Sequence, residues 1–184
     1  MTNAQSKIIL LLVFCLLTGI FSFKILSENW KINQPDVKIF WSMPNGDKKG
    51  NISALEGTIS FEPDAYEKGM ITATVETKTI DAGIEKLNNH LLTADFFDAE
   101  NHPKITFTSE KISRTDSGFV ATGKLAMRDS IHTIEIPFQF MKTESQTILK
   151  GTMNIFAGDY GVGKKSPTGK DEVIITIEVP ITKE

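Results

Sequence analysis

Two aspartates, Asp95 and Asp98, flank a pair of phenylalanines in the stretch "HLLTADFFDAENHPKITF", which begins at His90. Two neighbouring carboxyl groups are an arrangement used in general acid and base catalysis. The surrounding sequence supplies neither a nucleophile nor a third group that would orient such a pair. Aspartates also favour turns, where their side chains accept hydrogen bonds from backbone amides. The pattern therefore favours a structural turn, and we predict that the protein has no catalytic residue and is not an enzyme.

Metal binding has little support in the sequence. The three histidines, His90, His102 and His132, fall in a helical patch, a turn and a strand, without the close spacing typical of metal ligands. Cys15 is the sole cysteine and lies in an apolar segment near the N-terminus, so the rest of the chain cannot form an internal disulfide. We predict neither a metal site nor a cofactor.

The stretch "GDYGVGKK", residues 158–165, comes close to a phosphate-binding loop. Four residues separate Gly158 from Gly163, and Lys164 follows, but Lys165 stands where that motif needs serine or threonine. The motif also needs a helix to begin there, whereas the next residues, Ser-Pro-Thr-Gly, lead into a strand pattern. A hairpin loop is favoured over a nucleotide site, and its lysines could contact an anionic group.

Most of the chain after Trp30 alternates between apolar and polar residues, which is the pattern of strands with one buried face. Turn sequences such as Pro44-Asn45-Gly46 separate many of these segments. Pro137 and Pro180 indicate an edge or a bulge, because proline cannot donate a hydrogen bond to a strand ladder. We predict strands at residues 36–43, 52–62, 71–76, 105–108, 119–128, 134–140, 147–156 and 173–181.

About eight strands joined by short connections indicate an all-β, antiparallel fold, either a sandwich or a barrel. One short helix is expected at residues 84–93, where Ile84, Leu87 and Leu91 recur at helical spacing. In a barrel, this helix and the following Phe96-Phe97 could lie across one mouth.

The N-terminal segment differs from the rest of the chain. Residues 8–23 are an uncharged apolar run between Lys7 and Lys24, which is typical of a signal peptide or a membrane anchor. Its length lies between those of the two kinds of segment, so both remain open. We expect an exported protein, periplasmic or otherwise extracytoplasmic, with residues 1–26 as signal or anchor and residues 27–184 as one domain.

The composition is that of an ordinary globular chain. Of 184 residues, 40% are hydrophobic and 23% are charged, which is enough for one domain with a sizeable core. The net charge is -3, and lysine and arginine are scattered along the chain. Nucleic acid is therefore not an expected partner.

The central sequence resembles a known family. The stretch "KTIDAGIEKLNNHLLTADFFDAENHPKITFTSEKI", which begins at Lys78, is similar to the signature of the YceI-like family, in which Ile-Asp leads to a helix with His-Leu, an acidic Phe-Phe turn and Pro-x-Ile-x-Phe. The segments "ATGKLAMRDSIHTIEIPF" and "DYGVG" continue the resemblance, which covers residues 30–182. The chain departs from the family pattern at Asn88-Asn89, Ala157 and Pro35-Asp36.

This resemblance implies a lipocalin-like barrel that holds a polyisoprenoid or a similar long apolar chain. A barrel of about eight strands can be filled by its own side chains or can hold one small ligand. A structural or interaction module with a self-filled core is therefore the alternative, and the oligomeric state stays open. As lipid-lining residues we predict Phe61, Val75, Leu91, Phe97, Phe107, Met127, Phe138 and Ile155. As head-group residues at the rim we predict His90, Lys164 and Lys165.

Overall fold

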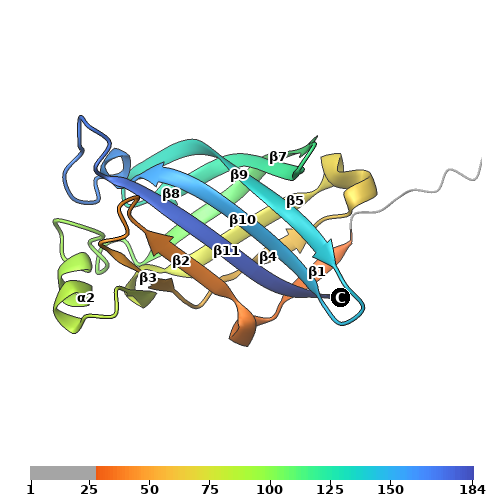
Figure 1. Cartoon of the computed structure of the whole chain (residues 1–184), viewed down its shortest axis with the longest axis horizontal. Helices are drawn as coiled ribbons and strands as arrows, with labels where there is room; N and C mark the ends of the chain where they lie inside the picture. Colours follow the sequence, from red (N-terminus) through yellow and green to blue (C-terminus); the bar gives the residue numbers. More distant parts are fainter. Residues whose placement is uncertain (1–27) are drawn as a thin grey trace, which may run out of the picture.

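The protein forms a closed antiparallel β-barrel with one short α-helix (Figure 1). The computed structural model describes residues 28–184, so Cys15 and the predicted signal or anchor segment lie outside the described residues. Within residues 28–184, no helix is long and apolar enough to cross a bilayer.

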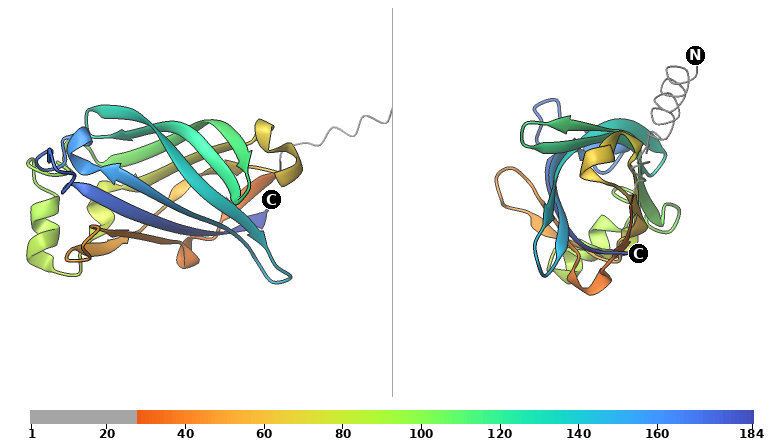
Figure 2. Two further views of the ribbon diagram at one scale, coloured as in Figure 1. Left: turned by 45° about the horizontal axis from the view of Figure 1, so that its top comes forward. Right: turned by 90° about the vertical axis from the view of Figure 1, so that its right-hand side faces the viewer.

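The wall consists of eleven strand segments, which pair in the order β1-β4-β5-β7-β8-β9-β10-β11-β2-β3-β6. A further pairing of β1 with β11 closes the ring, as the end-on view of Figure 2 shows. The segments are β1 (Asn29–Ile32), β2 (Lys38–Ser42), β3 (Lys49–Ile52), β4 (Glu56–Ser60), β5 (Met70–Glu76), β6 (Ile80–Asp81), β7 (Lys104–Thr115), β8 (Gly118–Met127), β9 (Ser130–Lys142), β10 (Thr147–Phe156) and β11 (Glu172–Lys183).

Short helices join these segments. The α-helix is α2 (Glu85–Leu91), two residues shorter at its C-terminal end than the range expected from the sequence. The 3-10 helices are η1 (Gln34–Asp36), η2 (Pro63–Lys68), η3 (Thr77–Thr79) and η4 (Ala157–Tyr160).

The eleven segments make an eight-stranded wall because three wall strands are each broken once. β1 and β2 are the two halves of one wall strand, and both pair with β11. β4 pairs with β1 and β3 pairs with β2, so β3 and β4 are the halves of the next wall strand. The breaks occur at η1, which contains Pro35, at Ala54, whose φ of 56° is left-handed, and at η3. The predicted all-β barrel of about eight strands is therefore confirmed.

Both strand prolines lie where a ladder is interrupted. The ladder between β9 and β10 ends at Phe138, paired with Gly151, so Pro137 is the first residue beyond it. Pro180 lies between Glu178, where the pairing of β11 with β2 ends, and Ile181, where its pairing with β1 begins. On the other side of each strand the ladder continues, through Val120 paired with Pro137 and Ile148 paired with Pro180. The missing proline N–H fits an interruption on one side of the strand only.

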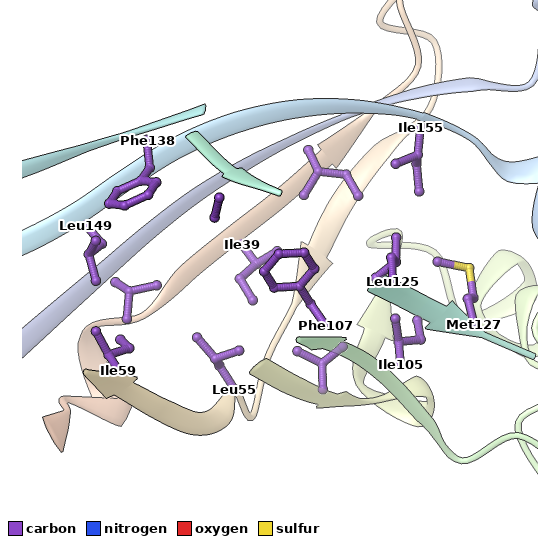
Figure 3. Packing of buried hydrophobic residues seen from close by; sticks show 14 of the residues in the cluster. Ile39, Leu55, Ile59, Ile105, Phe107, Leu125, Met127, Phe138, Leu149 and Ile155 are labelled. Carbon is purple, nitrogen blue, oxygen red and sulfur yellow. The ribbon is translucent and has the colours of Figure 1, made fainter. Parts of the chain in front are cut away.

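Alternation along the strands sends one set of side chains into the barrel. In β8, the residues from Phe119 to Met127 alternate between buried and more exposed positions. Figure 3 shows side chains from different strands, among them Ile59, Phe107 and Leu149, turned toward the same interior. The core of the domain is therefore the inside of the barrel.

The barrel has two differently built ends. One end, here called the α2 end, carries α2, the loop at residues 157–171 and the turns at 43–48 and 128–130 (Figure 1). The other, here called the β1 end, carries β1, η2 and the turn between β9 and β10 (Figure 2).

Candidate functional site

The barrel interior contains an apolar cavity of about 160 Å³. Side chains from most of the wall strands line it, including Ile59, Val75, Ala121, Ile136 and Met153. An apolar cavity of roughly this size stays dry and can accept a benzene-sized group. The protein's own side chains therefore leave room for a narrow apolar ligand.

The structure separates the eight predicted lining residues into two groups. Four of them line the cavity: Val75, Phe107, Met127 and Phe138. The other four pack elsewhere in or against the core: Phe61, Leu91, Phe97 and Ile155. A role of either group in lipid binding stays a prediction.

Aromatic rings fill the β1 end of the barrel. Phe61 is fully buried, and its ring centroid lies 4.9 Å from that of Phe119, 5.4 Å from that of Phe138 and 5.3 Å from that of Phe140. The indole of Trp30 donates a hydrogen bond to the carbonyl oxygen of Phe61, at 2.8 Å. Phe61 is therefore part of a packed plug at this end rather than a wall of the cavity.

Phe96 and Phe97 cover the α2 end, where both are partly buried against the core. The backbone N–H of Phe97 donates to the carbonyl of Leu91, which folds this loop back onto α2. The backbone N–H of Gly163 donates to the carbonyl of Asp95 at 3.0 Å, so the loop after η4 is joined to the phenylalanine loop. Together, residues 93–98 and 158–163 form what we call the cap.

Arg128 holds the two halves of the cap together. Its Nη1 donates to the carbonyl oxygens of Phe96 and Gly161, one in each loop. The residue follows β8 directly and adopts a φ of 53°, a left-handed conformation that is costly for a long side chain such as arginine. The turn between β8 and β9 thus places the guanidinium between the two loops at the expense of backbone strain.

We expect Arg128→Met to lower the free energy of unfolding by about 2 kcal/mol, since it removes hydrogen bonds from a charged donor to two carbonyl groups. Arg128→Gly loses the same bonds but relieves the left-handed backbone, so it should be more stable than Arg128→Met by about 1 kcal/mol. Urea unfolding measures both values. Equal stability of the two variants would show that the backbone at this turn is not strained.

The three predicted head-group residues all lie at the α2 end, outside the cavity wall. His90 is exposed on α2, with its ring edge against Phe96 at a centroid distance of 4.5 Å. Lys165 pairs with Asp159 at 2.6 Å, and this hydrogen-bonded partner raises the pKa of the lysine. Lys164 is exposed in the same loop. Over residues 28–184, no three His, Cys, Asp or Glu side chains gather as a metal site.

Asp98, one of the two aspartates of the phenylalanine loop, has structural partners. Asp98 adopts a left-handed φ of 49°, and its carboxylate accepts hydrogen bonds from the amide of Asn101 at 3.0 and 3.1 Å. Its carbonyl accepts from the backbone N–H of His102 at 2.8 Å. These contacts give Asp98 the turn-forming role that its sequence context predicts.

Asn88, one of the departures from the family pattern, fixes the start of α2. Its amide oxygen accepts from the backbone N–H of Ala82, and its amide nitrogen donates to Asp81, both at 2.7 Å. The backbone N–H of Gly83 and the amide of Asn88 lower the pKa of Asp81, because both donate to its carboxylate. The neutral amide of Asn88 thus positions the helix against the Asp81 carboxylate.

Several cavity residues were not anticipated from the sequence. Ala121 and Gly151 line the cavity because their small size leaves space, although neither stands out in a pattern of large apolar residues. Their position on the inward face of β8 and β10 is the signal that could have found them. Leu55 lies between β3 and β4, outside any strand, and lines the cavity. Strand alternation does not predict which way a residue in such a connection faces.

A closed antiparallel barrel, one capped end and an apolar interior define a lipocalin-like β-barrel. The chain belongs to the YceI-like family: the model of the YceI-like domain matches residues 30–181. Among curated proteins, Protein YceI of Escherichia coli is 26% identical over 78 residues, and a UPF0312 protein of Pectobacterium atrosepticum matches to the same extent. These matches span 42% of this chain and 41% of each relative. A UPF0312 protein of Azotobacter vinelandii is 23% identical over 71% of both chains.

Solved structures share the fold. BcnA of Burkholderia cenocepacia has a TM-score of 0.77 at 21% identity, over 83% of this chain and 100% of that one. A polyisoprenoid binding domain from Saccharophagus degradans, implicated in plant cell wall breakdown, has a TM-score of 0.59 at 12% identity, over 86% and 99% of the two chains. At these identities the similarity establishes the barrel fold.

Proposed function

We propose that this protein is an exported, noncatalytic lipid carrier that holds a polyisoprenoid or a similar long apolar chain inside its barrel. The observation that supports this most directly is the apolar cavity between Val75, Phe107 and Met127. Membership of the YceI-like family and the fold shared with a polyisoprenoid binding domain also support the proposed lipid binding.

Burial alone supplies enough free energy for such binding. Each methylene group removed from water contributes about 0.8 kcal/mol before ordering costs, so a long chain needs few polar contacts. The cavity of about 160 Å³ is narrow, so a longer tail must displace flexible side chains. Met127 and Met153 line it, and methionine adapts to such changes more readily than branched residues do.

Export rests on the sequence before the barrel. Residues 8–23 form the apolar run, which would either be cleaved as part of a signal peptide or anchor the domain, residues 27–184, at a membrane surface. Cell fractionation with an antibody against the barrel tests this part of the proposal.

Native purification of the full chain, followed by lipid extraction and mass spectrometry, tests the carrier function. We expect one class of long-chain lipid, such as an isoprenoid, in near-stoichiometric amount. A chain that is repeatedly empty, and that also fails to take up a fluorescent apolar probe, would instead support the self-filled structural module.

A further inference from the structure

The barrel wall is closed between β1 and β4 by a short ladder only. These strands form only two residue pairs, Asn29 with Ser60 and Trp30 with Ile59. The pairing of β1 with β4 does not continue to Lys31 and Ile32. The pairing of β1 with β11, on the other side of the strand, does extend to Ile32. The ladder therefore ends within the wall and leaves a break in it.

A groove of about 560 Å³ lies at this break. Its lining residues include Trp30, Ile32 and Ile59. Trp30 and Ile59 are buried and belong to the hydrophobic core. Ile32 and Ile59 also line the interior cavity. Since the same two side chains contact both spaces, they are the partition between the outer groove and the inner cavity.

The groove differs from the cavity in its chemistry. Whereas the cavity is almost entirely apolar, the rim of the groove carries amides, hydroxyls and charges of both signs. Its polar lining residues include Asn29, Lys31, Gln34, Glu56, Thr58 and Glu184. With two carboxylates and one ammonium group, this rim favours a neutral, hydrogen-bonding group over a phosphate.

We propose that the groove between β1 and β4 is the head-group site: an amphiphile places its apolar tail in the cavity and a neutral polar head, such as a hydroxyl, in the groove. This inference rests on the proposed lipid-carrier function. It locates the head at the β1 end, away from His90, Lys164 and Lys165. The tail passes between Ile32 and Ile59 on the side beyond the Trp30–Ile59 pair, where β1 and β4 are no longer paired.

The two tryptophans of the chain make the orientation measurable, because they lie toward opposite ends of the barrel. Trp30 lines the groove, whereas Trp41 lies in β2 close to the turn at the α2 end. The full chain with Trp41→Phe reports on the groove, and the full chain with Trp30→Phe reports on the α2 end. The probe is geranylgeraniol that carries a nitroxide at its hydroxyl end, which quenches only nearby indoles.

We expect saturable loss of most of the Trp30 emission and little loss of the Trp41 emission. Strong quenching of Trp41 with little quenching of Trp30 would place the head at the α2 end and overturn the inference, while leaving the carrier function intact. A probe with the nitroxide at the tail end should give the reverse pattern. If neither probe quenches either indole in a saturable manner, tail binding itself fails, and the proposed function fails with it.

A charge substitution tests the chemistry of the groove. Glu56→Lys should strengthen binding of geranylgeranyl phosphate, relative to geranylgeraniol, by roughly two- to fivefold, the range expected for an exposed charge pair. The matched control is Glu85→Lys, which makes the same exchange at an exposed position on α2. An equal effect of the two substitutions, or a larger one from Glu85→Lys, would contradict a head-group site between β1 and β4.

Discussion

Replacing Ala121 with phenylalanine is expected to abolish saturable binding of an apolar ligand, with a rise in Kd of at least about a hundredfold, or roughly 2.8 kcal/mol. Ala121 is 2% exposed and lines the cavity from the inner face of β8. Since a cavity of this size accepts about one benzene ring, a phenyl group attached to its wall occupies the space the ligand needs. Titration with a fluorescent apolar probe measures the effect.

Ala126 provides the matched control. It lies on the same strand but on the outer face, between the buried Leu125 and Met127. Ala126→Phe adds the same ring without entering the cavity, so probe affinity should stay within about twofold of the unsubstituted protein, or roughly 0.4 kcal/mol. Overpacking can destabilise a core by about 1–3 kcal/mol, so thermal unfolding must show that Ala121→Phe remains folded. A folded Ala121→Phe that binds the probe normally would place the ligand outside the cavity.

The inward faces of the strands could be predicted from the sequence, because strand alternation is local. The alternating segments predict that Phe107 and Val75 face the interior, and both line the cavity. Phe61 lies within the predicted strand at residues 52–62 as well, yet it packs among rings at the β1 end. Alternation tells which side of the wall a residue faces, but not how far along the barrel axis it lies.

The break between β1 and β4 could not be predicted, because it arises from pairing between distant segments. Nothing in the local pattern of residues 29–32 or 56–60 shows where their ladder ends. The same holds for Arg128, which contacts two loops that are far from each other in the sequence. Its role becomes visible only when the cap is assembled, because its guanidinium bonds to a carbonyl in each loop.

The ends of the barrel differ in a way that fits a carrier. At the β1 end, aromatic rings are packed on one another, and Ile32 and Ile59 separate the adjacent side groove from the interior cavity. At the α2 end, the cap is held by hydrogen bonds from Arg128 and Gly163 to loop carbonyls. Packed rings resist displacement more than single loop contacts, so the plug carries more of the stability than the cap does.

Phe61→Ala should therefore lower the free energy of unfolding by about 3–5 kcal/mol, the range for removing a buried phenylalanine ring. Phe61 has no exposed surface, and the rings of Phe119, Phe138 and Phe140 would all lose contacts. Because a domain of this kind is stabilised by roughly 5–15 kcal/mol in total, the loss is a large part of its stability. Urea unfolding followed by circular dichroism measures it.

Phe40→Ala is the control, since Phe40 lies on the outer face of β2 and is 49% exposed. That substitution should change stability by no more than about 0.5 kcal/mol. Phe61→Leu keeps most of the buried volume and should cost clearly less than Phe61→Ala. A loss below about 1 kcal/mol for Phe61→Ala would mean that the ring is not part of a plug and that the neighbouring phenylalanines can collapse into its place.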